Sequence, residues 1–390
     1  MNRHLGLLVL CQGLFLTNNV AFIAINGLVG LSLAPRPWMA TLPVMGYVVG
    51  GALSTGIVAR TQRRWGRRGS FQIGLVVAFA SALACAAAAS TRSFALLCLA
   101  TLVAGYYSAN ATLYRFAAAE LVGPDWREKA VSLLMAGGLI GAVVGPNLAS
   151  HTRGWLPAPF AGAYLALAGV ALLSMAAMAF IRFPAPPVRA AGAPAGRPLS
   201  EIARQPAFIV AAAGGALGYG VMNLLMAATP LAMDVCGLPF SDAAFVLQWH
   251  VIGMFAPGFF TGHLIRRFGA LPVMAAGLLL NLGCIAIALS GVDLHHFLAA
   301  LFLLGVGWNF LFTGSTTMAL GTYRPEEKDR VQAALNFCIF ATLAVTSFAS
   351  GVLVTTQGWQ WLNIGSLVPV ALIALALGWL AGARRREAAA

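Results

Sequence analysis

Twelve apolar segments separated by charged residues, glycine or proline dominate the sequence. Each is close to the roughly 20 residues that a helix needs to cross the hydrocarbon core of a bilayer. Charged residues make up only 9% of the chain, against roughly 25% in soluble domains, so a soluble globular fold is excluded. We therefore predict an all-α membrane protein with twelve transmembrane helices. The expected helices are 5–30, 38–59, 70–90, 94–119, 129–151, 160–181, 206–233, 242–264, 270–290, 295–320, 329–355 and 359–382.

The basic residues indicate how these helices are oriented. The formal net charge of +13 would suit a nucleic-acid-binding protein, but the 24 Lys and Arg residues are not spread evenly. Apart from Arg36, Arg92, Arg153 and the intramembrane Arg115, they lie in alternate loops or at the chain ends. By the positive-inside rule, both termini and the proline-rich linker at 182–205 are expected in the cytoplasm. We expect a multi-pass protein of the bacterial cytoplasmic (inner) membrane, with the lipid bilayer and no nucleic acid as its partner.

The two halves of the chain resemble each other at a spacing of about 200 residues. Gly66-Arg67-Arg68 after the second segment corresponds to the run Arg266-Arg267-Phe268-Gly269 after the eighth. The loops at 124–129 and 325–330, each beginning with proline, also correspond. Such a repeat is typical of duplicated transporters. It predicts an N-terminal six-helix bundle at 1–181, a linker at 182–205 and a C-terminal six-helix bundle at 206–390.

With this repeat the chain resembles the major facilitator superfamily. The run Gly262-His263-Leu264-Ile265-Arg266-Arg267-Phe268-Gly269 is similar to the family's G-x-L-x-D-R-x-G loop, with Arg266 in place of the usual Asp. The resemblance implies two six-helix bundles that work by alternating access. No Walker loop or HExxH motif occurs in the sequence, so we expect a transporter and not an enzyme.

Two spaced pairs carry the most distinctive chemistry inside the predicted helices. These are Met222-x-x-x-Met226 and His250-x-x-x-Met254, which lie at comparable depth on consecutive helices of opposite direction. Residues four apart share one helix face, and soft thioether and imidazole ligands favour Cu(I). We therefore predict a copper(I) site formed by Met222, Met226, His250 and Met254. Methionine is also a common filler of apolar cores, and packing remains the alternative interpretation.

These pairs, 28 residues apart from Met222 to His250, resemble the CcoA-like copper importers of the major facilitator superfamily. The resemblance implies that the four side chains bind copper as the transported substrate, with no permanently bound cofactor. It also implies copper import for the assembly of cbb3-type cytochrome c oxidase, with a copper chaperone or oxidase assembly factors as partners. Met233 and Cys236 extend the row of donors outward and are the expected entry relay.

The alternative function is transport of a small organic molecule such as riboflavin or a drug. Aromatic side chains inside the predicted helices, Trp308 among them, would stack on such a cargo. Polar groups inside a membrane are costly and often functional. Arg115, Trp308 and Asn309 are the residues expected to line the substrate cavity.

Overall fold

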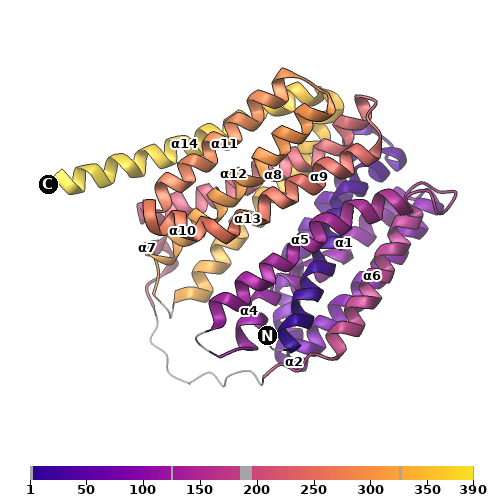
Figure 1. Cartoon of the computed structure of the whole chain (residues 1–390), viewed down its shortest axis with the longest axis horizontal. Coiled ribbons are helices and arrows are strands. Elements are labelled where there is room, and N and C mark those ends of the chain that lie inside the picture. Colours follow the sequence, from indigo (N-terminus) through magenta and orange to yellow (C-terminus); the bar gives the residue numbers. More distant parts are fainter. Residues whose placement is uncertain (1–2, 124–125, 185–195, 325–326, 390) are drawn as a thin grey trace.

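The computed structural model describes residues 3–123, 126–184, 196–324 and 327–389, and these residues are mainly helical (Figure 1). The helices are α1 (Arg3–Leu33), η1 (Pro37–Met39), α2 (Leu42–Ser90), α3 (Phe94–Ala111), α4 (Tyr114–Glu120), α5 (Arg127–Thr152), α6 (Ala161–Ala179), α7 (Leu199–Ile202), α8 (Pro206–Val235), α9 (Phe240–Phe255), α10 (Gly258–Phe268), α11 (Ala270–Ser290), α12 (Leu294–Leu320), α13 (Lys328–Thr356) and α14 (Gly358–Ala389).

The described residues contain the twelve membrane spans that the sequence predicts. Ten helical segments are long and apolar enough to cross a bilayer, and the pair α9 and α10, bent by 40°, makes an eleventh span. The twelfth arises because α2 contains two spans that meet at Gly66. Gly66 has a φ of 68°, a left-handed conformation that glycine adopts readily. The turn between the second and third spans therefore depends on this glycine.

The fourth span departs from the single helix expected at 94–119. It breaks after Ala111, and α4 begins at Tyr114. The hydroxyl of Thr112 donates to the carbonyl of Ala109 at 2.8 Å, while the Leu113 N–H donates to Asn110, three residues back. Side-chain hydrogen bonds of this kind compete with the helical backbone pattern. The break sets the direction of α4 and of Arg115 in its first turn.

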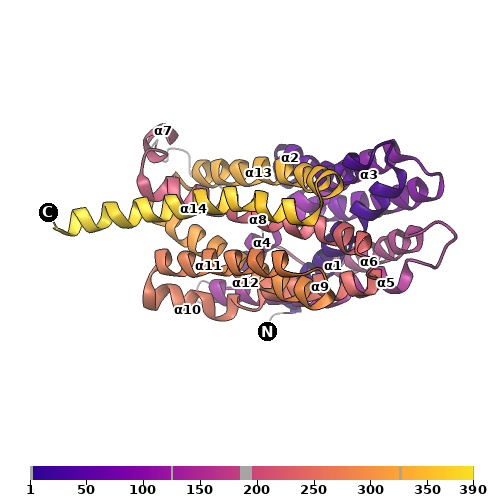
Figure 2. The same cartoon turned by 90° about the horizontal axis from the view of Figure 1, so that it is seen from above.

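Helices α1–α6 form one half of the molecule and α8–α14 form the other (Figures 1 and 2). The N-terminus, α4 and α7 lie at one end of the bundle, here called the linker end, and the loop between α5 and α6 lies at the opposite end (Figure 1). Helix α5 packs against α9, and α2 packs against α13. These two pairs join the halves and frame the space between them.

At the linker end, Arg197 is bound to the start of α13 through Glu327. The Glu327 side chain is fully buried, and its carboxylate accepts hydrogen bonds from Nη2 and Nε of Arg197 at 2.8 and 2.9 Å. The backbone N–H groups of Arg197 and Arg324 donate to the same carboxylate. These hydrogen bonds, those to the Arg197 side chain foremost, lower the pKa of Glu327 to about 2.

Replacing Glu327 by Gln is expected to lower the melting temperature by a constant amount between about pH 5.5 and pH 8. A lowered pKa gives stability that is fully present above the ordinary carboxyl pKa of 4.5 and is lost as the pH falls through about 2. The difference between wild type and Glu327→Gln should therefore shrink only below about pH 4.5. Thermal unfolding of both proteins in detergent across this range measures it. A difference that changes between about pH 6 and pH 8 would contradict the assignment.

Candidate substrate cavity between the two halves

A cavity of about 270 Å³ lies between the halves of the protein. Its walls come from α1 to α5 on one side and from α8, α9, α12 and α13 on the other. This volume is close to the lower end of the range of about 300–1,000 Å³ that is usual for small-molecule sites, so the cavity suits one small organic molecule. Most of its lining is apolar or aromatic, with amides such as Asn19 and Asn336 among the polar groups.

A cluster of aromatic rings forms one wall of the cavity. Trp308 and Phe312 on α12 stack with ring centroids 5.0 Å apart and an angle of 10° between their planes. Tyr219 on α8 meets both rings edge-on, at 5.1 and 5.6 Å, and Phe255 meets Trp308 at 6.2 Å. All four residues line the cavity. Such a wall offers ring faces and edges to a flat aromatic molecule.

A second cavity, of about 230 Å³, extends from the first toward the linker end. Both are lined by Arg115, Phe312, Asn336 and Ile339. The second also reaches Tyr323, which follows the end of α12. The two cavities therefore form one path from the middle of the bundle toward the linker end.

At the opposite end the two halves meet. Phe160 packs edge-on against Phe240 at 5.0 Å, and the Arg153 guanidinium lies 5.6 Å from each ring centroid. The Asn147 amide donates to Gln248 at 2.6 Å, which links α5 to α9. The substrate cavity is thus closed at this end and approached from the linker end.

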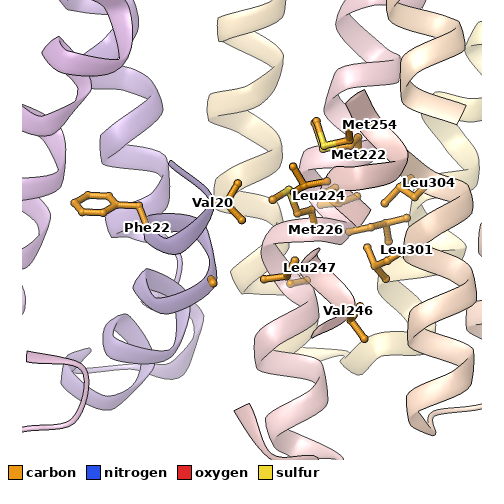
Figure 3. Packing of buried hydrophobic residues seen from close by; sticks show 14 of the residues in the cluster. Val20, Phe22, Met222, Leu224, Met226, Val246, Leu247, Met254, Leu301 and Leu304 are labelled. Carbon is orange, nitrogen blue, oxygen red and sulfur yellow. The ribbon is translucent and has the colours of Figure 1, made fainter. Parts of the chain in front are cut away.

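Three of the four predicted copper ligands line this cavity, and the fourth is not described as lining it. Met222, Met226 and Met254 line it, and Figure 3 shows them packed with leucine and valine side chains. His250 is fully buried and is not among the residues described as lining the cavity. Its Nδ1 atom is 2.7 Å from the carbonyl oxygen of Leu301 on α12. Among the residues that the structure describes, no group of three or more His, Cys, Asp or Glu side chains could hold a metal ion.

Of the other predicted site residues, only some line this cavity. Arg115 and Trp308 line the cavity. Asn309 does not, because its amide donates to the carbonyl of Met254 and accepts from Thr261, both at 2.7 Å. Met233 is fully buried in α8, and Cys236 is exposed beyond the end of that helix.

Tyr219 and Phe312 line the cavity and were not singled out from the sequence. Their spacing could have indicated them. Tyr219 lies three residues before Met222 and seven before Met226, and Phe312 lies four after Trp308. These intervals place Tyr219 on the helix face of Met222 and Met226, and Phe312 on the helix face of Trp308.

Comparisons with known proteins agree with the geometry of two six-helix halves. The family model of the major facilitator superfamily matches residues 5–259 and 249–390. Riboflavin transporter RfnT of Brucella anthropi is 40% identical over 381 residues, covering 96% of this chain and 95% of that protein. The uncharacterized transporter YddS of Bacillus subtilis is 26% identical, covering 92% and 86% of the two chains.

Solved structures show the same fold. A bacterial homologue of the human lysosomal transporter Spinster, in an inward-facing and occupied conformation, superposes with a TM-score of 0.74 at 15% identity. That match covers 98% of this chain and 96% of the homologue. A bacterial homologue of the iron transporter ferroportin, in an inward-facing state, gives a TM-score of 0.70 at 16% identity and covers 96% and 98%.

The prediction of copper import is wrong, because the chain shares 40% identity over nearly its whole length with a riboflavin transporter. The methionine spacing predicts a shared helix face, but it does not identify the cargo, because thioethers also pack well against apolar and aromatic groups. The family match, the relative and the twelve spans establish the family but not the cargo. This chain is a multi-pass membrane protein of the major facilitator superfamily.

Proposed function

We propose that this protein transports riboflavin, or a flavin closely related to it, across the bacterial cytoplasmic membrane by alternating access. The observation that carries the proposal is the aromatic wall of Tyr219, Phe255, Trp308 and Phe312 in a cavity sized for one small molecule. A flavin presents a flat three-ring system, which such a wall binds by stacking. The 40% identity to a riboflavin transporter supports the same cargo.

The cavity path supports the alternating-access part of the proposal. The halves touch at the end far from the linker, through Phe160 and Phe240, and the cavity extends toward the linker end. By the positive-inside rule, the basic loops support a cytoplasmic location for the linker end. The structure then corresponds to the inward-facing state, and rocking of the halves would expose the same aromatic wall to the other side.

Riboflavin uptake by a bacterial host that cannot synthesise riboflavin tests this function. Expression of the wild-type chain is expected to restore growth at low riboflavin concentration. Trp308→Ala should lower the initial uptake rate about tenfold or more, because stacking of a heterocycle on an aromatic side chain contributes about 1–3 kcal/mol.

The matched control is Trp361→Ala, which removes a Trp from α14 whose side chain is 60% exposed on the outer surface. This variant should transport at the wild-type rate. If the wild-type protein reaches the membrane and the cells take up no riboflavin, the proposed function is wrong.

A further inference from the structure

Arg115 is a charged residue placed inside the path between the halves. It lies in the first turn of α4, just after the break at residues 112–113, and it lines both connected cavities. No other Arg, and no Lys, Asp or Glu, occurs among the described residues that line either cavity. The protein therefore brings one positive charge to a site with an otherwise neutral lining.

The described contacts of Arg115 do not use its hydrogen-bonding capacity. Its guanidinium lies 4.9 Å from the ring centroid of Phe116, and its Nε atom is buried without a hydrogen-bond partner among the described residues. The acid on the same helix, Glu120, instead pairs with Arg67, whose Nη2 lies 2.6 Å from Oε1. A buried N–H donor that has no acceptor is costly. A ligand that supplies acceptor atoms would offset that cost.

The aromatic wall adjoins this cation. Phe312, one of the stacked pair, lines both cavities together with Arg115. Tyr219, which packs edge-on against Trp308 and Phe312, lines the first cavity together with Arg115. A flat ring held against Trp308 and Phe312 would therefore lie in the same cavity as the Arg115 side chain.

We propose that Arg115 determines specificity by binding the acceptor-rich edge of a flavin ring. This inference rests on the proposed function and extends it to a recognition element. The pyrimidinedione part of the flavin carries two carbonyl oxygens and ring nitrogens along its edge. A guanidinium presents several N–H donors in a rigid planar fork, which suits adjacent acceptors in one plane. Substrates of this site are then flat heteroaromatic molecules with carbonyl acceptors at one edge.

Equilibrium binding to the purified full-length protein, followed by quenching of protein fluorescence, tests the inference with three probes. Riboflavin carries both the acceptor edge and the ribityl chain, lumichrome keeps the edge without that chain, and phenazine is a flat three-ring molecule without carbonyls. Arg115→Met should weaken riboflavin and lumichrome binding by a similar factor, about ten- to a hundredfold, since a hydrogen bond to a charged group is lost. Phenazine binding should change less than about threefold.

Two further variants make the result specific. Arg115→Lys keeps the charge without the fork, so it should recover part of the lost flavin affinity. Arg64→Met, which removes an exposed surface arginine that stacks on Trp65, should leave all three affinities unchanged. Melting temperatures of the variants show that each is folded.

The outcomes separate the two proposals. Unchanged flavin affinity in Arg115→Met, or an equal loss for all three probes, would overturn the role of Arg115 while riboflavin binding by the wild type stands. Failure of the wild-type protein to bind riboflavin would overturn the proposed function itself, and the role of Arg115 with it.

Discussion

Replacing Gly351 by Val is expected to hold the protein away from the conformation seen here and to reduce transport sharply. Gly351 on α13 packs directly against the side chain of Thr41 at the start of α2, where a Cβ atom would collide. Trp38 and Phe348 meet edge-on in the same region, at 6.1 Å. This contact helps to close the end of the cavity far from the linker. Overpacking costs about 1–3 kcal/mol, which shifts an equilibrium between two states about 5- to 150-fold.

Two measurements check the effect of Gly351→Val. The initial rate of riboflavin uptake should fall about tenfold or more. Independently of cargo, a cysteine placed at Thr316, an exposed residue of the cavity near the linker end, should react more slowly with a thiol reagent. This labelling is done in detergent on a protein whose six native cysteines are replaced. The slower reaction follows because a protein that cannot close one end spends more time closed at the other.

Two control variants distinguish an effect on closure from an effect on folding in this experiment. Gly378→Val adds the same side chain to α14 at a glycine where a Cβ atom would meet no other atom within 4 Å, and it should behave as wild type. Thr41→Gly removes the colliding partner and should restore part of the uptake lost in Gly351→Val. Wild-type labelling of the cysteine at Thr316 in the Gly351→Val protein would show that this contact does not govern closure.

The positions of the membrane spans could be predicted from the sequence because bilayer thickness sets one length scale for all of them. Breaks within spans were harder to predict. Pro257 lies between α9 and α10, where a proline cannot donate a helical hydrogen bond. The break before α4, at residues 112–113, has no proline or glycine that would mark it in the sequence. Hydropathy alone therefore does not predict it.

The candidate site was predictable only as separate helix faces. Met222 and Met226 were expected to share a face, and both line the cavity. What fills the space between the halves depends on which faces of distant helices meet, and Tyr219, Phe255 and Phe312 come together only in the fold. His250 shares the face of Met254 by spacing, yet its ring reaches the carbonyl of Leu301 on a neighbouring helix. Sequence spacing therefore predicts which residues share a helix face, but it does not identify the cargo, because thioether side chains suit both metal binding and apolar packing.

The close approach of α2 and α3 carries the largest expected effect on stability. Gly50 on α2 packs against the backbone of Leu102 on α3, and Gly105 on α3 packs against the backbone of Gly50 and Gly51. In a bilayer, helices associate through such close packing of small residues, because lipid tails are as apolar as the side chains. A Cβ at position 50 would overlap the Leu102 carbonyl, and backbone atoms cannot move aside as a flexible side chain can. Gly50→Ala should therefore force the two helices apart and lower the unfolding free energy by about 3 kcal/mol or more.

Gly169→Ala is the matched control for this prediction, because both variants add one methyl group to a helix in the same half of the protein. Gly169 on α6 has nothing within 4 Å of where its Cβ would lie, so alanine there should stabilise the protein by about 0.5–1 kcal/mol through its helix propensity. Melting temperatures in detergent should then move in opposite directions, with Gly50→Ala also reducing the yield of monodisperse protein. Equal melting temperatures for the two variants would mean that α2 and α3 can separate at no cost, which contradicts the packing of Gly50 on Leu102. The opposite signs are expected because the same methyl group meets a carbonyl oxygen at one position and open space at the other.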